Sequence, residues 1–129
     1  MNSTTVTSEQ RRNRRLFVEK PVGVAVLAGA FSYLIRRPQF QARTRNVSTQ
    51  GLELLATQPL AVGAALKLWM PVQIGGLTPT IELRGTVVWA GVDAATGLKI
   101  SRIQLDNRPH EAMELWSQSI VEKLRLSEA

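Results

Sequence analysis

The sequence predicts a mainly β protein, a small antiparallel barrel or sandwich that ends in one α-helix. Roughly five or six short segments between residues 22 and 100 alternate apolar and polar side chains, with turn residues between them. After Asn107-Arg108-Pro109 the period changes, and apolar residues recur at helical spacing. A chain of 129 residues with 44% hydrophobic and 20% charged residues is long enough for one domain with a hydrophobic core.

The expected strands follow one another along the middle of the chain. The first is rich in small and β-branched residues and stops at Arg36-Arg37-Pro38, because proline lacks the amide that a central strand donates. Gly75-Gly76 with Pro79 predicts a loop before the longest strand, in which Trp89 falls on the same face as Leu83. The expected strand segments are 22–34, 40–47, 52–55, 66–72, 81–89 and 97–100.

The C-terminal helix is expected over residues 108–126. Pro109 stands near its first position and Glu111 in its first turn, where each residue type is favoured. We expect its apolar stripe to pack on the strands, and contact with a partner protein is the alternative. The residues of this stripe are Met113, Trp116, Ile120 and Leu124.

The N-terminal part divides into a tail and a basic arm. Residues 1–10 are polar and expected to be disordered, and residues 11–126 are expected to form the domain, with the arm at 11–20. The arm begins with Arg11-Arg12-Asn13-Arg14-Arg15, and the net charge of +6 favours an anionic partner such as nucleotide, nucleic acid or acidic membrane. Arginine favours bidentate or stacked recognition of an anion or a base, and a solvated tail is the alternative.

A membrane or export signal is not expected. Arg14-Arg15-Leu16-Phe17-Val18 resembles a twin-arginine export signal, and an apolar run follows at 22–35. However, Glu19-Lys20-Pro21 intervenes, and a run of about fourteen residues is too short for a transmembrane helix. We therefore expect a cytoplasmic protein without a membrane span.

The sequence offers little catalytic chemistry. His110 is the one histidine and is expected to be exposed at the helix start, and the absence of Cys removes thiolate metal sites. No glycine-rich phosphate loop is present, Ser48 has no evident base, and the carboxylates are scattered. We expect a binding protein without cofactor or metal rather than an enzyme.

The segment Asn46-Val47-Ser48-Thr49-Gln50-Gly51 is the strongest indication of a binding site. Asn46 and Ser48 are two residues apart, so they project from one face of a strand end and can hydrogen-bond the edge of a planar heterocycle. Gly51 predicts either a positive φ or the close approach of another group. The same residue types also form ordinary turns, and a plain turn is the alternative.

In this order, these segments resemble the PilZ domain family over about residues 9–126. Three features match: Arg11-x-x-x-Arg15 before the first strand, the D/N-x-S-x-x-G motif at Asn46, Ser48 and Gly51, and the run 84–89 followed by 97–100 and a terminal helix. The 31 positions from Arg15 to Asn46 are several more than usual in the family. We expect the excess in the turn around residues 30–38.

The resemblance implies a six-stranded antiparallel β-barrel that binds cyclic di-GMP, alone or as a stacked dimer, and signals through an unidentified effector protein in motility, exopolysaccharide or biofilm control. The arm would close over the ligand. We expect Asp in place of Asn46 to be tolerated, because an acidic residue also accepts from the N1–H and N2–H groups of guanine. Trp89 is either a stacking surface or part of the core. The implied ligand residues are Arg11, Arg12, Arg14, Arg15, Asn46, Ser48, Gly51 and Trp89.

Two other functions fit the same fold. A PilZ-like adaptor would act through protein contacts without binding nucleotide. A basic barrel for RNA or single-stranded DNA would need exposed aromatic residues interleaved with basic ones, and the chain has only three Phe, one Tyr and three Trp, most of them in apolar runs. We therefore expect no nucleic-acid partner.

Overall fold

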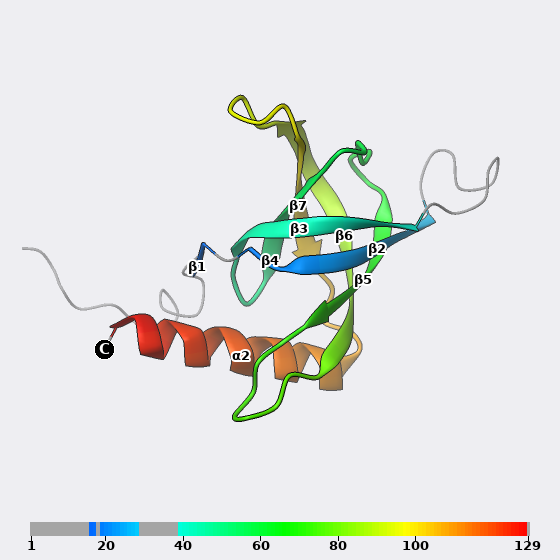
Figure 1. Cartoon of the computed structure of the whole chain (residues 1–129). Coiled ribbons are helices and arrows are strands. Elements are labelled where there is room, and N and C mark those ends of the chain that lie inside the picture. The colour runs from blue at the N-terminus through cyan, green and yellow to red at the C-terminus, as the bar shows by residue number, and fades with distance from the viewer. Residues whose placement is uncertain (1–15, 18, 29–38, 129) are drawn as a thin grey trace, which may run out of the picture.

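The computed structural model describes residues 16–17, 19–28 and 39–128 (Figure 1). Within them, strands follow in the order expected from the alternating pattern and one helix ends the chain. The elements are β1 (Leu16–Phe17), β2 (Pro21–Ala28), β3 (Gln39–Val47), β4 (Gly51–Ala56), β5 (Ala65–Pro71), β6 (Thr80–Val92), β7 (Lys99–Leu105) and α2 (His110–Glu128).

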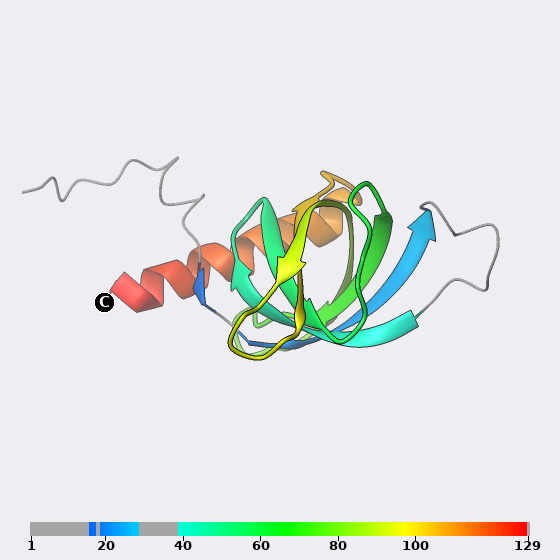
Figure 2. The same ribbon diagram turned by 90° about the horizontal axis from the view of Figure 1, so that it is seen from above.

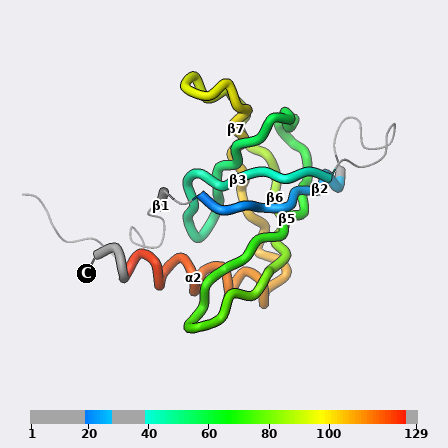
Figure 3. The backbone as a smooth tube through the Cα atoms, viewed as in Figure 1, coloured from blue at the N-terminus to red at the C-terminus, as the bar shows by residue number. Residues whose placement is uncertain are grey.

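The described strands form a six-stranded antiparallel barrel with one C-terminal helix, as predicted. The barrel order is β3-β2-β5-β6-β7-β4, and the pairing of β4 with β3 closes it. The two-residue strand β1 is not one of these six strands and pairs with the end of β3. The path of the ribbon around the barrel can be followed in Figures 2 and 3.

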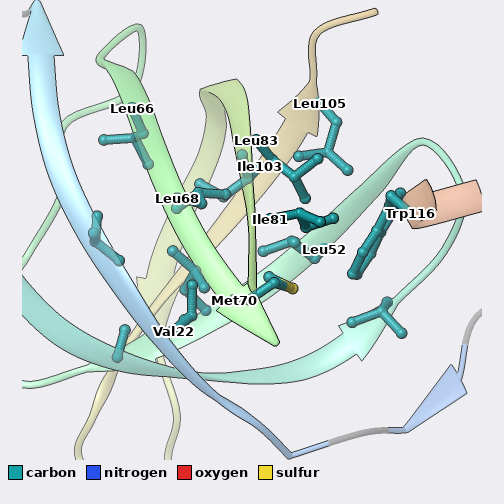
Figure 4. Close-up of a cluster of buried hydrophobic side chains, with 14 of the residues drawn as sticks. Val22, Leu52, Leu66, Leu68, Met70, Ile81, Leu83, Ile103, Leu105 and Trp116 are labelled. Atoms are coloured by element: carbon teal, nitrogen blue, oxygen red, sulfur yellow. The ribbon is translucent and has the colours of Figure 1, made fainter. Parts of the chain in front are cut away.

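The interior of the barrel is filled by the apolar face of each strand. In β5, Leu66, Leu68 and Met70 are fully buried, while the residues between them are half-buried. Figure 4 shows these side chains in one buried cluster with Leu83 of β6 and Ile103 of β7. Burial of about 1.5–3 kcal/mol per large apolar side chain makes this face the main source of stability.

Helix α2 crosses one end of the barrel (Figures 1 and 2). Its four predicted stripe residues are buried and belong to the same hydrophobic cluster as the barrel interior. The prediction that this stripe packs on the strands is therefore confirmed. Among the described residues, no helix combines the length and the apolar composition that spanning a membrane requires.

Three strand limits set by described residues differ from the sequence prediction by more than one residue. The largest difference is at the end of β7, which lies at Leu105 rather than at residue 100. Strand β7 begins at Lys99 rather than at Gly97, because Gly97 has a φ of 75° in the turn that joins β6 to β7. The Asp93 carboxylate holds this turn by accepting from the amide and hydroxyl of Thr96, at 3.1 and 2.6 Å. Strand β6 continues to Val92, three residues beyond the predicted end. The expected turn at 30–38 lies outside the described residues.

Of the two interpretations of Trp89, the one that places it in the core is wrong. A β-bulge shifts the register between Val87, which pairs with Ile103, and Trp89, which pairs with Arg102. The additional residue, Val88, moves Trp89 to the outer face of the barrel, where its side chain is 44% exposed. The strict alternation expected along this strand therefore ends at the bulge.

Candidate functional site

The segment 46–51 runs from the end of β3 through a tight turn into β4, and Ser48 closes this turn. The Ser48 amide donates to the Gly51 carbonyl oxygen at 2.8 Å. The Ser48 hydroxyl oxygen accepts from the amides of Gly51, at 3.2 Å, and Gln50, at 3.4 Å. The interpretation of this segment as a turn is therefore confirmed, and a role in ligand binding would come in addition to it.

Gly51 is required by the close approach of β7. A Cβ atom at this position would lie 2.5 Å from the carbonyl oxygen of Ile103, which is a backbone atom and cannot rotate away. Gly51 is not among the described glycines with positive φ. Of the two explanations that the sequence left open, close approach is the correct one, and the approaching group is the neighbouring strand.

Helix α2 holds the turn in place. The Trp116 indole is 2% exposed, and its Nε1 donates to the Ser48 carbonyl oxygen at 2.9 Å. A buried indole N–H needs such a partner, so the bond fixes the turn and the helix relative to each other. Trp116 therefore supports the site through the backbone of Ser48.

A second β-bulge lies in β3, next to this turn. Thr44 pairs with Leu54 and Val47 pairs with Leu52, so two residues of β3, Arg45 and Asn46, face the single residue of β4 between those leucines, Glu53. Bulges of this kind redirect side chains. Here the bulge lets both Arg45 and Asn46 reach the same carboxylate.

Glu53 is the centre of a polar cluster on the outer face of the barrel. The residue is only 3% exposed, and among the described residues three side chains donate to its carboxylate. Asn46 Nδ2 donates to Oε1 at 2.8 Å, and Arg45 Nε donates to the same oxygen at 3.3 Å. Arg102 Nη2 donates to Oε2 at 3.1 Å from β7. Arg45 Nη1 also reaches Asp93 Oδ1, at 3.4 Å.

These donors keep Glu53 ionised. Burial by itself raises the pKa of a carboxyl group, because it disfavours the charged form. The hydrogen bonds from Asn46 and Arg102 and the charges of Arg45 and Arg102 outweigh burial, and the pKa of Glu53 is lowered. Glu53 therefore acts only as a hydrogen-bond acceptor at neutral pH.

Arg102 joins Glu53 to Trp89. It faces Glu53 on β4 and Trp89 on β6 in the strand register, and its guanidinium carbon lies 5.1 Å from the centre of the Trp89 ring. Its Nε is buried and has no hydrogen-bond partner in the part of the chain that the structure describes. Neither Arg102 nor Glu53 was among the predicted ligand residues. The signal in the sequence was Glu53, a charged residue between Leu52 and Leu54 in an otherwise apolar segment.

A groove with a volume of about 880 Å³ runs between this cluster, the turn and helix α2. This volume is within the usual range for small-molecule sites, roughly 300–1,000 Å³. Three predicted ligand residues, Asn46, Ser48 and Gly51, line the groove together with Arg102. Trp89 does not line the groove, but its ring contacts Arg102, which does. The remaining lining residues include Gln50, Val88, Gln104, Asn107, Met113, Ser117 and Val121.

Strand β1 connects the basic arm to this groove. Leu16 pairs with Val47 and Phe17 pairs with Asn46. Arg15 precedes Leu16 in the chain, and consecutive Cα atoms are about 3.8 Å apart. The arm is therefore attached beside the motif. Four predicted ligand residues lie outside the described residues: Arg11, Arg12, Arg14 and Arg15.

The described residues show no group of three or more His, Cys, Asp or Glu side chains that could hold a metal ion. His110 is exposed at the start of α2, as expected. The residues that line the groove offer hydrogen bonds and the positive charge of Arg102, which suits binding of a polar planar or anionic ligand.

Comparison with known families identifies the class of protein. Residues 9–115 match the model of the PilZ domain, and this chain belongs to the PilZ domain family. PilZ domains are in general binding modules without catalytic activity. Among curated proteins, none gives a significant match to the sequence.

Solved PilZ structures share the fold of this chain. The PilZ domain of Escherichia coli YcgR, solved with c-di-GMP, is 15% identical over 92% of this chain and 94% of that chain, with a TM-score of 0.57. MotI/DgrA, the Bacillus subtilis inhibitor of motility, is 15% identical over 89% of this chain, with a TM-score of 0.65, and this chain spans 52% of its length. A tetrameric PilZ domain from Xanthomonas campestris is 9% identical, covers 90% of both chains and has a TM-score of 0.63.

Proposed function

We propose that this chain is a cytoplasmic receptor for cyclic di-GMP that has no enzymatic activity. The observation that supports this most directly is the pairing of β1 with the end of β3. This pairing attaches the arginine-rich arm beside Asn46, at the edge of a groove of ligand size. The pairing supports the proposal that both motifs of the family serve one site, because the arginine motif directly precedes β1 in the chain.

The groups of the groove match the chemistry of the ligand, which has two guanines and two phosphates. Asn46 presents an amide at the groove, and the carbonyl oxygen of an amide accepts hydrogen bonds from the N1–H and N2–H groups of guanine. Arg102 offers a guanidinium for a phosphate or for a guanine edge. Trp89, exposed and stacked on Arg102, offers an aromatic face to a second guanine.

The arm would supply the remaining positive charge. Arg11 and Arg15 can pair bidentately with a phosphate or with the O6 and N7 atoms of guanine, and Arg12 and Arg14 can add phosphate contacts. Closing the arm over the ligand would cost about 1–2 kcal/mol per ordered residue, which limits affinity. It would also create a new surface made of arm and ligand. Amide exchange would then show ligand-dependent protection in residues 10–17 and 46–51.

The output of such a receptor would pass to a separate effector protein. The outer end of β6 offers a surface for it, since Val88, Trp89 and Val92 are 44–57% exposed. Motility, exopolysaccharide synthesis and biofilm formation are the processes that we propose for this output. MotI, which shares the fold, is an inhibitor of motility.

Isothermal titration calorimetry with cyclic di-GMP tests the proposal, with GTP, cyclic di-AMP and a short single-stranded oligonucleotide as controls. We expect saturable binding of cyclic di-GMP alone, and the stoichiometry distinguishes a single ligand from a stacked dimer. A folded protein that binds none of the four would favour the adaptor function. Binding of the oligonucleotide in preference to cyclic di-GMP would favour a nucleic-acid partner.

A further inference from the structure

The buried carboxylate of Glu53 determines which way the Asn46 amide faces. An ionised carboxylate only accepts hydrogen bonds, so the group at 2.8 Å from Glu53 Oε1 must be the Asn46 NH₂ group. The Asn46 carbonyl oxygen is then the atom left for a ligand in the groove that Asn46 lines. The amide cannot reverse without placing its carbonyl oxygen against the carboxylate.

This orientation has a consequence for base recognition. A fixed acceptor at the groove fits guanine, which presents the N1–H and N2–H donors on its pairing edge. Adenine presents an acceptor at N1 where guanine presents N1–H, and its one donor on that edge is the N6 amino group. An adenine held in the position of the guanine would therefore place its N1 acceptor against the Asn46 oxygen. A site built to receive a donor rejects an analogue that lacks one, because a polar group would be left unpaired.

We propose that Glu53 is a positioning residue that aims the Asn46 carbonyl oxygen at guanine, and that it makes this chain depend on Asn rather than Asp at position 46. The proposal rests on the proposed function, because it assigns specificity to the same cyclic di-GMP site. Glu53 itself contacts side chains rather than ligand.

The requirement for Asn follows from the same geometry. An Asp at position 46 would place a second carboxylate at hydrogen-bond distance from Glu53, and two carboxylates at that separation cannot both stay ionised without strong repulsion. We expected from the sequence that Asp would be tolerated at this position, because a carboxylate also accepts from guanine N1–H and N2–H. The contact with Glu53 argues against that expectation in this chain. Glutamine at position 53 would relieve the repulsion, because its NH₂ group can donate to the new carboxylate while its oxygen accepts from Arg102.

A double-mutant cycle measured by calorimetry tests the proposal with four full-length proteins: wild type, Asn46→Asp, Glu53→Gln and the double variant. We expect Asn46→Asp to weaken cyclic di-GMP binding tenfold or more and the double variant to return to within about threefold of wild type. Gln41→Glu adds the same negative charge on an exposed position of β3 outside the groove and should change affinity less than twofold. Equal affinities of Asn46→Asp and wild type would overturn the proposal.

Base preference separates positioning from simple structural support. Glu53→Gln lets the Asn46 amide adopt either orientation, so the ratio of cyclic di-GMP to cyclic di-AMP affinity should fall at least fivefold. A merely structural role would lower both affinities together and leave the ratio unchanged, which would also overturn the proposal.

A measurement without ligand keeps this inference independent of the receptor assignment. In urea unfolding at pH 7, Asn46→Asp should lower the midpoint, and Glu53→Gln in the same chain should restore it. The loss in Asn46→Asp should also shrink on acidification, as one carboxyl group takes up a proton. If wild type binds no cyclic di-GMP, the receptor function fails, and this stability cycle still decides whether Glu53 orients Asn46. A double variant no more stable than Asn46→Asp would refute the pairing.

Discussion

Replacing Trp116 by Phe should destabilise the protein by about 2–4 kcal/mol, because it removes a hydrogen bond and part of a packed side chain at one place. The indole is 2% exposed and donates to the Ser48 carbonyl oxygen at 2.9 Å. Phe has no donor, so this carbonyl loses its side-chain partner at a cost of about 1–3 kcal/mol. The smaller ring adds about 1 kcal/mol for the space that it leaves.

Urea unfolding followed by circular dichroism measures this loss. Trp69→Phe is the matched control, because Trp69 is only half-buried on β5 and its ring meets Lys67 Nζ at 5.7 Å. The control should lose less than about 1 kcal/mol, the size of an exposed cation–π contact. Trp116→Phe should also weaken cyclic di-GMP binding, since the turn that it anchors holds Asn46. If both substitutions cost the same, the hydrogen bond to Ser48 does not stabilise the turn.

Three further predictions concern the arm, the turn glycine and the half-buried Lys20. Arg15→Ala should lower cyclic di-GMP affinity tenfold or more, since a charge-assisted hydrogen bond contributes about 1.5–3 kcal/mol. Arg84→Ala, at an exposed position of β6, is the control and should not lower it. Equal affinities of the two variants in calorimetry would identify the arm as a solvated tail. Gly51→Ala should lower the free energy of unfolding in urea by about 1–3 kcal/mol, because its Cβ would lie 2.5 Å from a backbone oxygen. Gly23→Ala, whose Cβ would have its nearest contact with a side-chain atom at 3.5 Å, should lower it less. The reverse order would show that the close approach of β7 does not require Gly51. Burial and, to a lesser extent, a neighbouring lysine lower the pKa of Lys20 to about 8, so its charge destabilises the folded state below pH 8 and this cost disappears as pH rises toward 10.5. Lys20→Met should therefore exceed wild type in stability by about 1 kcal/mol at pH 7, after allowance for solvent screening, and the excess should fade by pH 10.5; a constant difference across that range would exclude this explanation.

The fold could be predicted from the sequence because burial imposes a period on it. Strand β5 alternates Leu66, Leu68 and Met70 with less buried residues, and the stripe of α2 recurs at helical spacing. The position of the candidate binding motif was predictable for a related reason. Polar residues at the end of an apolar strand mark the rim of a barrel, where side chains are free to meet a ligand.

The bulges in β3 and β6 could not be predicted from a single sequence. A bulge adds one residue to a strand, and every later side chain then changes face, although the residue types themselves show no break. This is why strict alternation put Trp89 on the wrong face and why Arg45 and Asn46 were not both expected to face β4. Glu53 is a charged residue between two leucines, and the sequence did not show what pairs with it. One of its partners, Arg102 on β7, is 49 positions away in the chain.

The bulges give the outer face of the barrel one continuous row of interacting side chains. The row starts with Asn46 on β3, continues through Glu53 on β4 and Arg102 on β7, and ends with Trp89 on β6, and each member contacts the next. These strands are neighbours in the barrel, so the row needs no loop to hold it together. A ligand that meets Asn46 at one end and Trp89 at the other would contact groups whose positions depend on the same buried carboxylate. Because each member contacts the next, any contributions of these residues to ligand binding would be coupled, and single substitutions alone would not separate them.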